Sequence, residues 1–218
     1  MSDGRGTVSV TARSRHRHQR ESDAGAAGNE RLTALTGAVL LVGFAAEGVT
    51  LLALGRLLTL HFFLGMMLIG PVALKICSTC YRFIRYYARA RPYVRRGPPA
   101  PLLRALGPLV IITSVTVLGT GIMLAVTGPR PGPWLLLHKA SFVLWFAVMA
   151  VHVLAYAWRV PRILLGSTSP ADPVLARTPV PGGAARLLLV TLAAVGGLLI
   201  ALLTMHLVTP WQVALAGR

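Results

Sequence analysis

Charged residues are scarce in this sequence of 218 residues: they make up 13% of it, against 55% hydrophobic residues and a mean hydropathy of +0.66. This balance excludes an ordinary soluble domain, because long apolar stretches of this kind indicate membrane spans. Cysteine is nearly absent as well, and Cys77 and Cys80 are too few for a disulfide framework. Their CSTC spacing is that of a redox motif, but a second pair is missing, so a zinc site is disfavoured. We expect buried, inert thiols.

Motifs of soluble catalysis are also missing. The long loops contain no dinucleotide fingerprint, phosphate-binding loop, HExxH motif or nucleophile elbow. Acidic residues number 6 against 22 Lys and Arg, which gives a net charge of +16. The basic residues fall in three blocks between apolar stretches, and this pattern favours a membrane topology signal over a nucleic-acid surface. We therefore expect membrane lipid, and no nucleic acid, as a partner.

The apolar stretches divide the chain into a tail and a bundle. Residues 1–31 are polar and lack apolar periodicity, which predicts a disordered basic cytoplasmic tail rather than a cleaved signal peptide. Residues 32–210 form the expected transmembrane bundle, and 211–218 a short outer tail. Each apolar segment has about the twenty residues that cross a core of roughly 30 Å. The predicted spans are 32–55, 58–80 (which can continue to 87), 103–127, 134–158 and 185–208.

The predicted class is thus an all-α integral membrane bundle of about five helices, since only helices satisfy their own backbone groups in lipid. The link GRL after the first helix and the link GPRPGP after the third are short, whereas the other two links are long and basic. The tail and the long links, with their edges, hold 17 of the 22 Lys and Arg. The positive-inside rule then predicts a cytoplasmic N-terminus and an outer C-terminus. The residue usage, with 20 Arg to 2 Lys, is typical of a GC-rich bacterium, so we expect a multi-pass protein of the bacterial plasma membrane.

Four histidines lie at membrane depth, where such side chains are functional candidates by default. His61 opens the second predicted helix, His138 opens the fourth, His152 lies deep in the fourth, and His206 closes the fifth. His138 and His152 are 14 residues apart, which is about 21 Å along an α-helix and within about 40° of the same face. This is the geometry that presents ligands to two haems stacked across a membrane. Lys75 follows His61 at the same spacing.

The two segments HFFLGMMLIGPVALK and HKASFVLWFAVMAVH resemble helices of membrane b-type cytochromes, namely the cytochrome b561-like and cytochrome b-like bundles. The resemblance implies that His61 and His138 are axial ligands of one outer haem b. Lys75 stands where the resemblance asks for a histidine, so it implies one haem, with His152 as a candidate ligand of a second.

The implied function is electron transfer by a subunit that works with a redox partner protein or a quinone, and it names no catalytic residue. Whether the chain is itself an oxidoreductase stays open. Arg56 and Lys139 lie near the expected outer haem and are candidates for its propionates, and Glu47 is a candidate for proton or propionate contacts.

Other interpretations of the same residues stay open. An intramembrane histidine commonly forms a hydrogen bond between helices, faces interfacial water, binds another metal or relays protons. Lys75 is expected to reach the cytoplasmic interface, and His206 to be interfacial. Glu47 can pair with Arg56 or His61. The alternative function is a cofactor-free polytopic scaffold or a small transporter, although an odd number of spans without a repeat makes transport less attractive.

Overall fold

The computed structural model describes residues 4–94, 101–156 and 181–217, and every element assigned in these ranges is helical. The long helices are α1 (Gly4–Thr50), α2 (Leu54–Tyr87), α4 (Pro101–Thr127), α5 (Trp134–Tyr156) and α7 (Gly183–Thr204). The short elements are η1 (Leu51–Ala53), α3 (Arg91–Val94), η2 (Met205–Val208) and α8 (Thr209–Ala216). Four helical segments in the described ranges are long and apolar enough to cross a membrane: Ala24–Tyr87, Arg104–Thr127, Trp134–Tyr156 and Gly183–Ala216. The expected all-helical class is confirmed, and the composition of these segments indicates a membrane protein.

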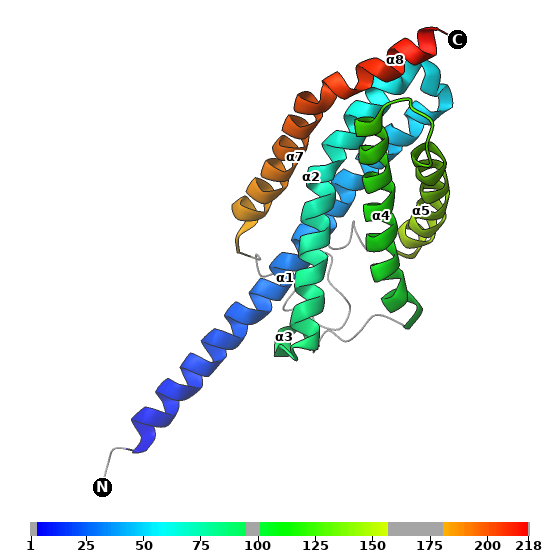
Figure 1. The fold of residues 1–218 in the computed structure, drawn as a ribbon. Coiled ribbons are helices and arrows are strands. Elements are labelled where there is room, and N and C mark those ends of the chain that lie inside the picture. The colour runs from blue at the N-terminus through cyan, green and yellow to red at the C-terminus, as the bar shows by residue number, and fades with distance from the viewer. Residues whose placement is uncertain (1–3, 95–100, 157–180, 218) are drawn as a thin grey trace.

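The segment Ala24–Tyr87 folds back on itself at η1, so that α1 and α2 lie side by side (Figure 1). Ala53 has φ −143° and ψ 48°, which interrupts the helix at the turn. The sequence placed this turn at residues 55–57, and that position is wrong because these residues already belong to the first turn of α2. Contacts between the two helices, from Asn29 with Ser78 to Glu47 with His61, determine where the chain reverses.

The N-terminal segment also differs from its expectation. α1 begins at Gly4, so the residues expected to form a disordered tail continue the first helix, which projects beyond the bundle (Figure 1). Residues 4–50 contain no proline and include eight Ala and six Arg residues, which favour helix. At the other terminus, most of the expected outer tail lies in α8. Trp158, the predicted end of the fourth span, lies outside the described residues.

The core of the bundle is the contact between α2 and α7, where two glycines bring the backbones together. A Cβ on Gly70 would collide with the carbonyl oxygen of Ala193, and a Cβ on Gly197 with that of Met67. Pro71 has no N–H, so the Met67 carbonyl lacks its usual helical donor and lies open to α7. Close approach of small residues is how helices associate in lipid, where apolar contact alone gives little advantage.

The remaining long helices, α4 and α5, lie side by side (Figure 1) and pack mainly against each other. A few side chains join them to the rest of the bundle. The Phe44 ring of α1 lies 4.8 Å from the Trp145 ring of α5, centroid to centroid, in an edge-to-face arrangement. The Trp145 indole N–H donates to Ser114 Oγ of α4 at 3.0 Å. Leu118 of α4 packs against a buried cluster that Leu40 of α1 forms with Leu68 and Val72 of α2. These contacts fix α5 at a set distance from α1 and α2.

We predict that Gly197→Ala destabilises the protein, because the new methyl group would strike the Met67 carbonyl. Overpacking of this kind costs about 1–3 kcal/mol. Thermal unfolding of the detergent-solubilised protein measures the effect. Gly196→Ala is the matched control, since a Cβ at that position meets no atom within 4 Å. Equal unfolding temperatures for the two variants would contradict the proposed contact.

Candidate functional site

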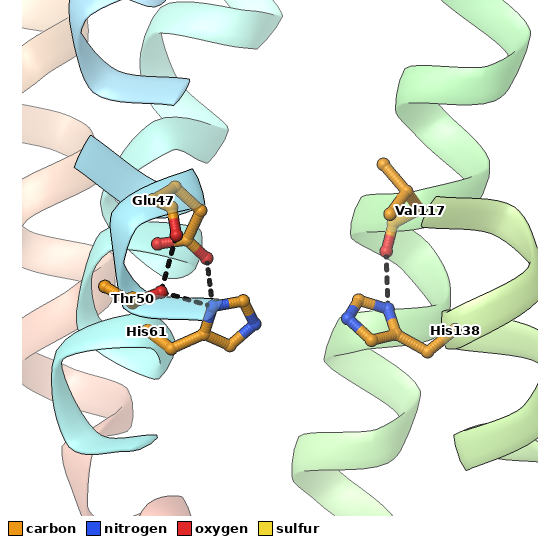
Figure 2. A network of polar contacts seen from close by, with 5 residues as sticks. All are labelled: Glu47, Thr50, His61, Val117 and His138. Carbon is orange, nitrogen blue, oxygen red and sulfur yellow. Dashed lines mark hydrogen bonds and ion pairs between the residues drawn. The ribbon is translucent and has the colours of Figure 1, made fainter. Parts of the chain in front are cut away.

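The strongest cluster of polar side chains lies at the end of the bundle where α1 ends, α2 begins, α4 ends and α5 begins. His61 projects from α2 and His138 from α5, and their rings face each other across the space between the two halves of the bundle (Figure 2). They are close enough to interact electrostatically. The structure therefore brings together the two histidines that the sequence singled out as a pair.

His61 is held through one ring nitrogen. Its Nδ1 lies 3.0 Å from Glu47 Oε1 and 2.9 Å from Thr50 Oγ1, both from the end of α1 (Figure 2). The Thr50 hydroxyl donates its own proton to the Glu47 carbonyl oxygen, so it accepts from the imidazole. In the neutral imidazole Nδ1 therefore carries the proton, and the lone pair is on Nε2. Side-chain exposure is 22% for His61 and 17% for Glu47, so water competes little for these bonds.

His138 is held in the same way by different groups. Its Nδ1 lies 3.2 Å from the Val117 carbonyl oxygen of α4 (Figure 2). The same nitrogen lies 3.2 Å from Thr120 Oγ1, also on α4. A carbonyl only accepts, so Nδ1 again carries the proton and Nε2 the lone pair. Gly121 makes room for the ring, because a Cβ there would lie 3.0 Å from His138 Cε1. Ser141 supports the arrangement through a 3.1 Å hydrogen bond to Thr120.

The two histidines thus have one orientation in common. Each donates from Nδ1 to the helix beside its own, His61 to α1 and His138 to α4, and among the described residues Nε2 has no hydrogen-bond partner. Metal-binding histidines nearly always have this second contact, which fixes the tautomer and the direction of the free nitrogen. Within the described residues no three His, Cys, Asp or Glu side chains gather around a common centre. Haem iron needs no such cluster, because its porphyrin supplies four ligands and the protein supplies the axial ones. The donor set therefore fits a bis-histidine haem.

Lys75 and His152 lie 14 residues after His61 and His138 on the same two helices, toward the opposite end of the bundle. Lys75 Nζ donates to the Thr33 carbonyl oxygen of α1 at 2.6 Å, over the bare backbone at Gly37. Its ammonium group therefore ends on a neighbouring helix, at the second residue of the first predicted span, and the expectation that Lys75 reaches the cytoplasmic interface stays a prediction. His152 is close enough to Lys75 to interact electrostatically, but its buried Nδ1 has no hydrogen-bond partner among the residues that the structure describes. Its ring lies 5.0 Å from that of Tyr156.

The other candidates occupy less specific positions. Of the two partners considered for Glu47, the structure pairs it with His61, and among the described residues its Oε2 is buried without a hydrogen-bond partner. Arg56 and Lys139 are exposed at the same end of the bundle as His61 and His138. His206 is exposed, and its Nδ1 lies 3.0 Å from the Leu203 carbonyl oxygen. The cysteines are free, but Cys77 is exposed and Cys80 half-buried, so the expectation of two buried thiols is wrong.

Three residues of the site escaped the sequence analysis. Thr50 and Thr120 accept hydrogen bonds from the two imidazoles, and Val117 contributes a main-chain carbonyl. Threonines are common in apolar helices, and most of their hydroxyls bond back to their own helix. A main-chain acceptor leaves no signal in the sequence at all. The pairing of helices had to be known before these residues became visible.

No family model matches this chain, and no curated protein or solved structure matches it either. A functional assignment therefore depends on the geometry of the chain's own residues. Its strongest element is the facing pair of imidazoles with defined tautomers.

We predict that both His61 and His138 carry their ring proton on Nδ1, as their carbonyl, carboxylate and hydroxyl partners require. Nitrogen-15 spectra of histidine-labelled, dithionite-reduced protein distinguish the two tautomers, with His61→Gln and His138→Gln used to assign the signals. Free histidine in the same buffer is the reference. A proton on Nε2 of either residue would contradict the orientation described here.

Proposed function

We propose that the chain is a five-span membrane electron-transfer protein that holds one b-type haem between His61 of α2 and His138 of α5. The observation that carries the proposal is the facing pair of imidazoles, each with Nδ1 bound and Nε2 free (Figure 2). Neutral imidazole nitrogens of this kind are the usual axial ligands of haem iron. The resemblance of α2 and α5 to b-type cytochrome helices supports the same assignment.

The proposed topology counts α1 and α2 as two crossings, because the segment Ala24–Tyr87 folds back at η1. With α4, α5 and α7 the count is five, and the N- and C-termini lie on opposite sides. Arginine supports the orientation: Arg82 and Arg85 near the end of α2, and Arg104 near the start of α4, gather at the end of the bundle away from His61. By the positive-inside rule this end is cytoplasmic, and the paired histidines lie near the outer face of a bacterial plasma membrane.

Haem supplies a one-electron couple when bound. The chain's own contribution is to hold the two imidazole nitrogens in place, through Glu47 and Thr50 on one side and Val117 and Thr120 on the other. Hydrogen bonds from Nδ1 to acceptors make each imidazole a stronger electron donor through Nε2. Arg56 and Lys139, exposed at the same end, are the proposed partners of the propionates. Such a subunit would pass electrons between a quinol or partner protein and a second redox protein.

The first test is the absorption spectrum of detergent-purified protein before and after dithionite, with a pyridine-haemochrome assay. We expect a b-type spectrum at about one haem per chain. His61→Ala and His138→Ala should each lose the haem while keeping the helical circular dichroism of the wild type. His206→Ala is the control, because this exposed histidine lies outside the pair. A colourless wild-type protein from a haem-replete host would overturn the proposal.

A smaller substitution tests how the His138 ring is positioned. We expect Gly121→Ala to weaken haem retention by about tenfold or more, because a methyl group 3.0 Å from Cε1 displaces the ring from its acceptors. Gly119→Ala, two residues away on the same helix, meets no atom within 4 Å and should retain haem as the wild type does. Haem transfer to apomyoglobin measures the retention. Equal transfer rates would show that Gly121 has no part in positioning His138.

The cofactor-free alternative has a specific observation in its favour. Glu47, Thr50 and His61 form a closed hydrogen-bonded network that joins α1 to α2 whether or not a metal is near. In a scaffold or small transporter this network would hold the turn at η1 in place. A colourless protein in which His61→Ala lowers the unfolding temperature, and His138→Ala does not, would favour this second function.

A further inference from the structure

Figure 1 shows the arginine-rich end of the bundle, where α2 ends and the chain turns into α3. A hollow lies at this turn. It measures about 600 Å³ and is lined by Tyr86, Tyr87, Arg89, Arg91 and Val94. We propose that this hollow binds the phosphate headgroup of an anionic phospholipid. The proposal does not depend on haem, because the hollow lies at the end of the bundle opposite the paired histidines.

The backbone at the rim of the hollow gives the first argument. Arg89 has φ 55°, a left-handed conformation that glycine adopts more easily than any side-chain-bearing residue. Three main-chain hydrogen bonds hold it there: Ala88 N–H to the Ile84 carbonyl at 2.8 Å, Arg89 N–H to Tyr86 at 3.0 Å and Ala90 N–H to Arg85 at 3.0 Å. A helix commonly ends in this way with glycine. The backbone of an arginine is strained in this conformation. The side-chain guanidinium is the one group that arginine offers here and glycine lacks.

Neighbouring arginines are already engaged with aromatic rings. Arg104 donates to the Tyr86 hydroxyl at 3.3 Å and lies 5.7 Å above the ring, which fixes one wall of the hollow. Arg85 lies 5.9 Å above the ring of buried Tyr93, which anchors α3. Arg89 and Arg91 remain exposed at the hollow itself. The hollow thus has a tyrosine wall that Arg104 contacts and two exposed guanidinium groups.

The chemistry of these walls suits a phospholipid. One guanidinium group donates two parallel hydrogen bonds to phosphate oxygens, so the two exposed guanidinium groups at the hollow suit a single phosphodiester. Tyrosine rings prefer the headgroup level of a membrane, and Val94 adds an apolar surface for the glycerol and the first acyl carbons. Among the side chains the structure describes, the acidic ones are Glu30 and Glu47, and neither lines the hollow. A free anion would use the guanidinium groups but not the apolar wall.

The test uses full-length protein in phosphatidylcholine nanodiscs that contain a minor fraction of phosphatidylglycerol. Bound phosphatidylglycerol is counted by mass spectrometry after the bulk lipid is exchanged. We expect Arg89→Gly and Arg91→Gln each to weaken retention of phosphatidylglycerol by about fivefold, the factor that corresponds to about 1 kcal/mol per basic residue. Arg89→Gly should keep or raise the unfolding temperature, because glycine relieves the left-handed backbone. Binding and folding are thereby separated.

Arg82→Gln is the matched control, since it removes one exposed positive charge from the same end of α2 without touching the hollow. Unchanged retention in this variant supports a defined site, whereas an equal loss shows a diffuse attraction and overturns the proposal. Inorganic phosphate separates the two sources of the same chemistry. Displacement of phosphatidylglycerol by millimolar phosphate would show that the ligand is a free anion, if phosphate also raises the unfolding temperature as much as phosphatidylglycerol does. This result would overturn the proposal as well.

Discussion

The close approach of α2 to α7 fixes the rotation of α2. This helix carries His61 and Lys75, one residue of each of the two levels set by the 14-residue spacing. Gly70 and Gly197 let the two backbones meet, and the carbonyl of Met67, released by Pro71, lies within this contact. In lipid, apolar side chains gain little from leaving one apolar neighbour for another, so such backbone contacts determine how helices associate. With one face of α2 held against α7, His61 projects toward α5. Gly65 then leaves room for Glu47, whose Oε1 would lie 3.3 Å from a Cβ at that position.

Polar groups in a low-dielectric bundle must find partners, and their arrangement at the paired histidines is informative for that reason. Both Nδ1 atoms have acceptors, so the unsatisfied capacity is concentrated on the two Nε2 lone pairs, which face each other (Figure 2). Among the described residues Glu47 Oε2 is buried without a hydrogen-bond partner, which is unfavourable for a carboxylate unless positive charge is near. Glu47 lies on the Nδ1 side of His61, away from His138 (Figure 2), so the donors directed into the space between the rings are the two Nε2 lone pairs. These lone pairs are the donors that the proposed haem would use.

Much of the fold could be predicted from hydropathy, because lipid imposes one rule on every backbone and the lengths of spans follow from it. The termini of the helices were less accessible. The turn between α1 and α2 falls at Leu51–Ala53 rather than at Gly55, since the pairing of Glu47 with His61 decides it and no local signal does. His61 and His138 could be found from their depth and spacing. Thr50, Thr120 and the Val117 carbonyl could not, because their role exists only once helices distant in the sequence are paired.

The 14-residue spacing defines two levels, His61 with His138 and Lys75 with His152, and the two levels differ in their hydrogen bonds. At the outer level both imidazoles have an acceptor behind them, which fixes the direction of the free nitrogen. At the inner level Lys75 already donates to the Thr33 carbonyl, and a protonated amine has no lone pair to offer. Among the described residues His152 has no hydrogen-bond partner for Nδ1, so no acceptor there sets its tautomer. Spacing alone treats the two levels as equivalent, but their hydrogen bonds differ, and this difference is why we propose a single haem between His61 and His138.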